Sequence, residues 1–248
     1  MMKTFVICPG TERAGTSWLH KYLSYGKDIN FGDLKEYHYF DSVHIKDFLY
    51  YKKNNLKHDI LYKFYENNDN YYQYFLDILQ NYKLTGDFSP GYSELNEEIL
   101  LNIKENFNNN NIDVKVIYLI RHPVDRHISA TNLRIKYDHM NLNNDEYNKL
   151  LVSNLNDKVF NIHSKYEETD LKLFNIFKEN YLIKKYEKLF NQKSTKQICN
   201  FLNINHHEAD FNIKINEKPI YNLEIFESTL NELYEYYTKE INFFNSID

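Results

Sequence analysis

The sequence predicts an α/β protein in which a central, mostly parallel sheet is flanked by helices and the C-terminal half is rich in helix. Three observations predict this class. Short apolar runs typical of buried strands alternate with segments whose apolar residues recur at helical spacing. All six glycines precede residue 92, so tight backbone turns are confined to the N-terminal third. Hydrophobic residues make up 42% of the chain, enough for a sizeable core.

The expected elements follow from these patterns in chain order. Strands are predicted over residues 3–8, 83–85, 114–120 and 181–184, and the first of them is expected to be buried. Helices are predicted over 16–25, 71–80, 95–107, 123–137, 145–155, 171–178, 195–202 and 223–244. The Asn-rich stretch 107–113 is predicted to be a surface loop, because its turn-forming residues interrupt both periods. Segment 223–244 fits packing within the chain and packing against another subunit equally well.

Length and charge restrict the class of protein further. With 248 residues we expect a single domain over 1–248. A net charge of -5 excludes the broad positive field that drives nonspecific binding to nucleic acid or anionic membranes. Cys8 and Cys199 are too few for a disulfide framework or a zinc site, and the apolar run 4–8 is too short for a signal peptide. We therefore expect a cytoplasmic, unanchored protein.

Residues 9–17 form a glycine-bearing loop between the first predicted strand and helix. Such a loop lets backbone N–H groups converge on a phosphate at a helix N-terminus. The nucleotide-triphosphatase pattern requires lysine after the second glycine, but Thr16 follows Gly15 here. Arg13 supplies a cation from inside the turn instead. The loop predicts a phosphate site that differs from a standard ATPase.

The segment from Arg13 to Trp18 resembles the 5′-phosphosulfate loop of the sulfotransferases. That resemblance implies a P-loop-like three-layer fold and 3′-phosphoadenosine 5′-phosphosulfate (PAPS) as donor, with adenosine 3′,5′-bisphosphate (PAP) as product and no required metal. It further implies a donor site at Arg13, Ala14, Gly15, Thr16, Ser17 and Trp18, in which Trp18 flanks the adenine. Arg13 stands where most members carry lysine, and would stabilise charge on the leaving phosphate oxygen.

A second motif follows the third predicted strand. Arg121 leaves the strand and Ser129 lies eight positions later, two turns along a helix that begins at Pro123. A guanidinium and a hydroxyl at this spacing can face one phosphate. The motif resembles the 3′-phosphate motif of the same family.

The segment 35–41 resembles the Lys-Glu-x-His-Phe-Phe-Asp segment of the heparan sulfate type of sulfotransferase. The resemblance makes Glu36 the catalytic base and places Lys35, His38 and Asp41 beside the acceptor. We expect burial among aromatic residues to raise the pKa of Glu36.

Two further segments resemble the family. Residues 87–92 resemble its acceptor-side segment, which adds Ser89 to the acceptor site, although Phe88 replaces the family lysine. Residues 186–189 place Tyr186 near the nucleotide. No glycine-containing basic loop is evident near the C-terminus, where Lys214 and Lys218 are the nearest candidates.

These motifs together predict a PAPS-dependent sulfotransferase that acts on an acceptor hydroxyl of a small molecule or a saccharide. No nucleic-acid or membrane partner is expected. No metal site is expected either, because His206 and His207 are adjacent and His122 and His127 share a helix with arginines. Two alternatives stay open at this point: an atypical P-loop nucleotide or small-molecule kinase, and a noncatalytic nucleotide-binding protein.

Overall fold

The computed structural model describes residues 3–212 and 222–247 and is built on a four-stranded parallel sheet. The strands are β1 (Lys3–Ile7), β2 (Leu84–Asp87), β3 (Ile112–Ile120) and β4 (Tyr181–Lys185), in the order β2-β1-β3-β4. In the register of the two central pairings, Val6 lies opposite Gly86 on β2 and Lys115 on β3. All four predicted strands are confirmed, and the sheet is entirely parallel.

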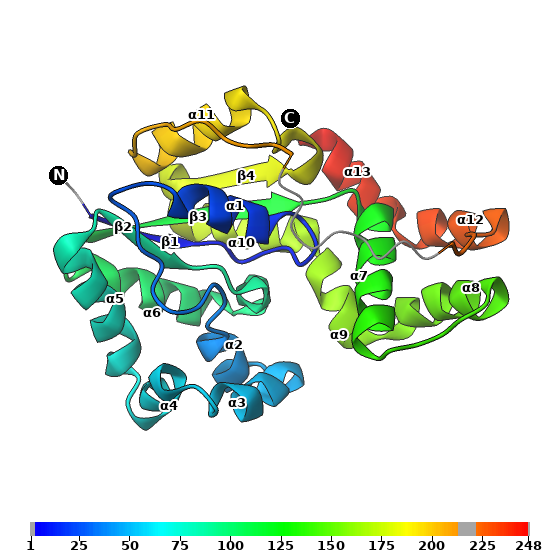
Figure 1. The fold of residues 1–248 in the computed structure, drawn as a ribbon, viewed down its shortest axis with the longest axis horizontal. Coiled ribbons are helices and arrows are strands. Elements are labelled where there is room, and N and C mark those ends of the chain that lie inside the picture. The colour runs from blue at the N-terminus through cyan, green and yellow to red at the C-terminus, as the bar shows by residue number, and fades with distance from the viewer. Residues whose placement is uncertain (1–2, 213–221, 248) are drawn as a thin grey trace.

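Helices cover both faces of this sheet (Figure 1). One face carries α1 (Thr16–Ser24) and α11 (Gln192–Leu202), and the other carries α5 (Asp69–Asn81), α6 (Glu97–Asn108) and α10 (Tyr166–Phe177). Successive strand residues point to opposite faces: Phe5 stacks on Phe107 of α6 with ring centroids 4.0 Å apart, whereas Val6 joins the core beneath α1. The predicted three-layer arrangement is confirmed.

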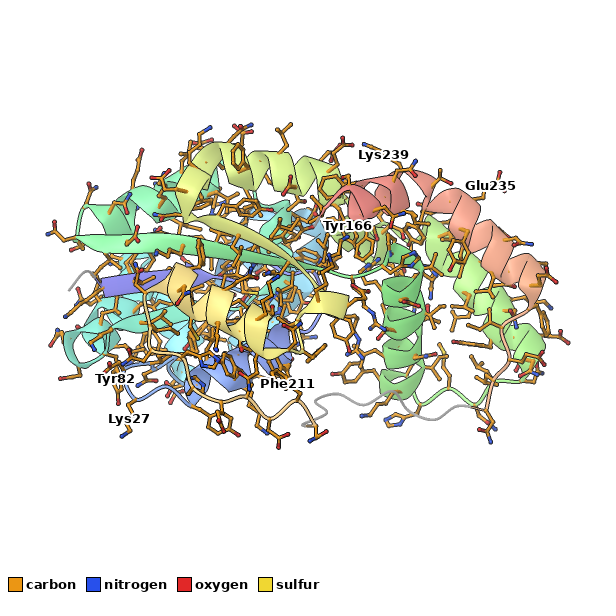
Figure 2. All side chains as sticks on the ribbon, turned by 90° about the horizontal axis from the view of Figure 1, so that it is seen from above. Lys27, Tyr82, Tyr166, Phe211, Glu235 and Lys239 are labelled. Carbon is orange, nitrogen blue, oxygen red and sulfur yellow. The ribbon has the colours of Figure 1, made fainter. Side chains whose placement is uncertain are left out.

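A second group of helices packs beyond the carboxyl ends of the strands (Figures 1 and 2). It comprises α7 (Pro123–Tyr137), α8 (Asn144–Ser153), α9 (Lys158–Asn161), α12 (Glu227–Tyr236) and α13 (Thr238–Ser246). Inside it, His127 is fully buried, with its Nδ1 2.8 Å from the Tyr237 hydroxyl and its Nε2 2.9 Å from the Leu151 carbonyl oxygen. These contacts fix α7 against α8 and α12, so the helix that carries Ser129 has a firm support.

Short helices between β1 and β2 were absent from the sequence prediction. They are α2 (Tyr39–His44), α3 (Leu49–Asn55) and α4 (Asp59–Glu66), which lie together on one side of the sheet (Figure 1). Each has six to eight residues and begins without a side-chain cap, so neither periodicity nor capping residues mark it in the sequence. Single turns of 3-10 helix occur at Lys46–Phe48, Pro90–Glu94, Asn154–Asn156, Ile162–Ser164, Lys178–Asn180 and Tyr186–Lys188.

Two predicted boundaries are wrong. The segment 107–113 is not a long loop, because α6 continues to Asn108 and β3 begins at Ile112. Only a turn remains, in which Asn111 adopts the left-handed conformation that asparagine tolerates. The segment 223–244 is not one helix but two, since the helical backbone is interrupted at Tyr237, whose hydroxyl is held by buried polar groups.

Within residues 3–212 and 222–247, no helix combines the length and the apolar character that crossing a bilayer requires.

The helix group offers a simple stability test at the start of α8. The Asn143 side chain accepts from the Glu146 N–H at 3.0 Å, and the Glu146 carboxylate accepts from the Asn143 N–H at 2.9 Å. Asn143→Ala leaves the Glu146 N–H to water and should lower the free energy of unfolding by about 1 kcal/mol in urea titration. Asn143→Ser retains a cap and serves as the control. Equal losses in both variants would contradict a capping role.

Candidate active site

The loop after β1 is held tightly against β3 and the segment after β4. The Gly10 carbonyl accepts from the Leu119 N–H at 2.8 Å, and the Thr11 N–H donates to the Leu119 carbonyl. Gly15 caps α1 with φ of 92°, and a Cβ there would lie 2.9 Å from Leu189 and 3.1 Å from Tyr186. Two features therefore require glycine at position 15: the left-handed backbone conformation and the close packing against Leu189 and Tyr186.

The structure brings the two predicted phosphate motifs together. Arg13 Nε donates to the Ser129 hydroxyl at 3.0 Å, and Arg121 Nη1 donates to the Arg13 carbonyl at 3.3 Å. The Arg121 guanidinium lies over the Tyr186 ring, 4.6 Å from its centroid. Four residues from three separate segments of the chain, all predicted from the sequence to bind the donor, thus form one cluster.

In the part of the chain that the structure describes, neither arginine of this cluster forms an ion pair with a carboxylate. Arg121 is 9% exposed, and its buried Nε has no hydrogen-bond partner. Burial lowers the pKa of Arg13, and the charge of Arg121 adds to that effect while Glu12 opposes it. A buried donor left unsatisfied costs free energy, which a bound phosphate oxygen would recover. The donor set therefore fits the phosphates of a nucleotide.

Neighbouring segments fix the start of α7, where the second motif begins. The Glu187 carboxylate accepts from the His122 N–H at 2.9 Å, so the segment after β4 caps the motif helix. The Tyr166 hydroxyl donates to the Arg121 carbonyl at 2.8 Å, and Tyr166 lies at the junction of the sheet and the helix group (Figure 2). These contacts orient Arg121 from both sides of its backbone.

Lys35 lies between the donor loop and Glu36 rather than only on the acceptor side. Its ammonium donates to the Ser17 hydroxyl at 2.7 Å, to the Thr16 hydroxyl at 3.3 Å and to the Glu36 carboxylate. The family resemblance places Lys35 beside the acceptor, which stays a prediction, and the structure also brings its ammonium to the start of α1. Lys35 thus supplies a cation beside the phosphate loop, in which Thr16 stands at the position where nucleotide triphosphatases have a lysine.

Glu36 belongs to a short chain of charged groups. Its Oε2 lies 3.2 Å from His38 Nε2, and His38 Nδ1 lies 2.6 Å from Asp41 Oδ2. Burial opposes the imidazolium form, but the Asp41 and Glu36 carboxylates outweigh it and raise the pKa of His38 to about 10. His38 therefore carries a proton at neutral pH.

The predicted rise in the Glu36 pKa is wrong. Burial does raise it, but the hydrogen bond from His38 and the charges of Lys35 and His38 are together stronger and lower the pKa of Glu36 to about 2. The carboxyl is consequently ionised throughout the neutral range, with its side chain 34% exposed. It is in the form that accepts a proton.

Asp41 and Ser89 lie behind the exposed groups of this site. Both are fully buried. The Ser89 hydroxyl donates to Asp87 at 2.6 Å and accepts from the His38 N–H at 2.8 Å. The direct acceptor contact predicted for Asp41 and Ser89 does not fit this burial, because their polar atoms are already engaged in holding His38.

Asp87 was missed by the sequence analysis and anchors the acceptor-side loop. It accepts from the Ser89 N–H at 3.0 Å and from the Tyr71 hydroxyl at 3.0 Å. Burial raises its pKa to about 6, although hydrogen bonds from Ser89 and other neighbours oppose the rise. Its position could have indicated a functional role, because Asp87 is the last residue of β2 and parallel sheets place functional groups at the carboxyl ends of their strands.

The remaining predicted residues fall in three places. Trp18 is 6% exposed and stacks on Tyr22, with ring centroids 5.5 Å apart, at the base of α1. Ala14 is fully buried in the donor loop. Lys214 and Lys218 lie outside the described residues. In the described part of the chain, no group of three or more His, Cys, Asp or Glu side chains is arranged to hold a metal ion.

The parallel sheet, its covering helices and the loop after β1 define a P-loop-like α/β protein. The family model described as the sulfotransferase domain matches residues 3–218, and the chain belongs to this sulfotransferase family. The structure of a sulfotransferase from Alicyclobacillus acidocaldarius resembles it with a TM-score of 0.60 at 15% identity, over 100% of this chain and 98% of that one.

A second similar structure is the sulfotransferase domain from the Synechococcus PCC 7002 olefin synthase, with a TM-score of 0.47 at 15% identity over 94% of each chain. None of the curated proteins matches this chain.

The His38 arrangement predicts a specific pH dependence of stability. The folded-state pKa of about 10 exceeds the unfolded value of about 6.5, so the folded state binds this proton more tightly. The contribution of His38 is complete below about pH 6.5 and is lost as the pH rises toward about 10. We expect the free energy of unfolding from urea titration to fall between about pH 7 and about pH 9. His38→Gln should remove most of this fall.

His127→Gln is the matched control, because burial lowers the pKa of His127 to about 4 and it does not titrate in this window. A pH dependence unchanged in His38→Gln would show that His38 is not a buried imidazolium.

Proposed function

We propose that this sulfotransferase transfers the sulfuryl group of PAPS to an acceptor hydroxyl without a metal ion. The observation that carries the proposal is the meeting of Arg13, Arg121 and Ser129, with the buried Arg121 Nε lacking a partner. Two phosphate-binding elements at one place suit a nucleotide with phosphates at both the 5′ and the 3′ position. A saccharide as the acceptor stays a prediction from segment 35–41, as does the single domain over 1–248.

In the proposed donor site, the N–H groups at the start of α1, with Thr16 and Ser17, would hold the 5′-phosphate. Arg121 with Ser129 would hold the 3′-phosphate. Tyr186 orients Arg121 from its ring face. Arg13 and Lys35 would lie near the bridging oxygen, where negative charge develops as the donor's sulfur–oxygen bond breaks.

The bound donor supplies the sulfuryl group and the phosphate leaving group. Glu36 accepts the proton of the acceptor hydroxyl as its oxygen forms the new bond to sulfur, and the old bond to the phosphate oxygen breaks in line. The transferred proton stays on Glu36, because Lys35 and His38 already carry protons, and it passes to water after the sulfated product leaves. Because the carboxyl is already ionised, positioning and charge neutralisation carry more of the catalysis than base strength does.

Nucleotide binding tests the donor site without knowledge of the acceptor. In calorimetric titration PAP should bind more tightly than ADP, with and without magnesium. Arg121→Ala should weaken PAP binding by about tenfold to a hundredfold and leave ADP binding nearly unchanged, since a buried charge-assisted contact to the 3′-phosphate is lost. Arg134→Ala, at an exposed arginine of α7, is the control. Tighter, magnesium-dependent ADP binding would instead favour a kinase.

Glu36→Gln tests the proposed base. It keeps the size of the side chain and a hydrogen-bond acceptor but removes proton acceptance. The kcat should fall by about 10²- to 10⁴-fold while PAP affinity stays within about twofold of the wild type. Turnover is followed with labelled donor, and Glu66→Gln on α4 serves as an exposed control. Full turnover in folded Glu36→Gln would refute this role, and donor binding without wild-type turnover on a broad acceptor panel would favour a noncatalytic protein.

A further inference from the structure

The phosphate loop contains a carboxylate that its proposed role does not explain. Glu12 lies between Thr11 and Arg13, and its side chain is 40% exposed. A negative charge here opposes the binding of phosphates. The nearest ionisable partner is His163, whose Nε2 lies 4.0 Å from Glu12 Oε2. Burial, aided by the charge of Arg126, lowers the pKa of His163 to about 3, so this imidazole is neutral at neutral pH.

The charges of two arginines act on Glu12 without forming an ion pair with it. Arg13 donates to Ser129. Arg126 is fully buried and donates through Nη2 to the Ser164 hydroxyl and to the Phe160 carbonyl, while its Nε and Nη1 have no hydrogen-bond partner. Both act on Glu12 only as background charges, since neither forms an ion pair with it among the residues that the structure describes. Glu12 is thus a partly exposed carboxylate without a cationic partner of its own.

An arc of aromatic rings connects Glu12 with the proposed base Glu36. The ring centroids of His163 and Phe48 lie 5.8 Å apart in a stack, those of Phe48 and Tyr51 lie 5.8 Å apart edge-on, and those of Tyr51 and His38 lie 3.8 Å apart in a stack. At the two ends, the Glu12 carboxylate lies 4.0 Å from His163 Nε2 and the Glu36 carboxylate lies 3.2 Å from His38 Nε2. The carboxylates at the two ends are both partly exposed. Their charges also interact directly, because Glu36 contributes to raising the pKa of Glu12 after the larger effect of burial.

Tyr50 extends this arc toward solvent. It is 49% exposed, and its ring centroid lies 4.2 Å from that of Tyr51. The Tyr50 ring also contacts Phe48, with centroids 6.4 Å apart, and Phe48 in turn stacks on His163 beside Glu12. In keeping with this placement, the charge of Glu12 adds to the effect of burial in raising the pKa of Tyr50. Behind the arc, His163 is 7% exposed and its Nδ1 has no hydrogen-bond partner. A half-exposed tyrosine ring near a carboxylate matches the chemistry that binds organic cations.

We propose that the acceptor carries a positively charged amino or quaternary ammonium group, bound by Glu12 and the half-exposed ring of Tyr50, while its hydroxyl meets Glu36. This proposal rests on the proposed sulfuryl transfer and names the acceptor class for the same site. It also explains the carboxylate in the donor loop, because a bound cation neutralises the charge that Glu12 would otherwise set against the phosphates.

Pairs of acceptors that differ only in charge test the inference. Trimethylammonium alcohols of increasing chain length are compared with the uncharged alcohols in which carbon replaces nitrogen. Calorimetry on the PAP-bound protein should show at least about tenfold tighter binding of the charged member of one pair or more, and transfer from labelled PAPS should follow the same order. Equal binding within every pair, or no binding of any charged alcohol, overturns the inference.

Glu12→Gln should abolish this preference by raising KM for the charged acceptor about tenfold, with kcat little changed and PAP affinity equal or higher. Tyr50→Phe should retain the preference, whereas Tyr50→Leu should reduce it. Glu235→Gln, on the exposed side of α12 far from the site, is the control for charge alone (Figure 2). An unaltered charge preference in folded Glu12→Gln overturns the role of Glu12.

The two proposals fail in distinguishable ways. If PAP binds and uncharged alcohols accept the sulfuryl group as well as charged ones do, only the inference about the acceptor is wrong. If PAP does not bind, or binds without any transfer, the proposed function itself is wrong, whichever alcohols bind.

Discussion

The parallel pairing of β1 with β3 is the constraint on which the rest of the site depends. Both strands end at the same edge of the sheet, so the loop after β1 and the start of α7 after β3 emerge side by side. The Leu119 backbone then joins the loop directly, and Arg121 reaches the carbonyl of Arg13. Two like-charged side chains are thereby held together by the backbone, and the free energy stored in that arrangement is available to bind an anion.

Much of the architecture could be predicted because it rests on local signals. Four buried apolar runs gave the strands, and Pro123 marked the start of α7. The helices α2 to α4 could not be predicted, since they are short, uncapped and stabilised by aromatic packing between distant residues, as where Phe40 meets Tyr71. Local periodicity carries no information about such contacts.

The sequence predicted which residues of the site lie together better than it predicted their pKa values. The motifs named the residues that meet around Arg121, and their roles stay predictions until donor binding is measured. The pKa of Glu36 was mispredicted because burial was considered without Lys35 and His38, although both are close in sequence. Asp87 lies in the segment 87–92 that resembles the family but was given no role, since its importance comes from hydrogen bonds with Ser89 and Tyr71 that form only in the folded chain.

The anchoring of the acceptor-side loop has a consequence for how this protein can diversify. Asp87 and Ser89 fasten His38 to the end of β2, whereas the donor loop is fastened to β3. The two halves of the site are therefore anchored to different strands of the sheet. Substitutions in the helices that follow His38 can change the shape of the acceptor site while the donor loop keeps its geometry. Acceptor specificity can therefore change through intermediates that still bind the donor.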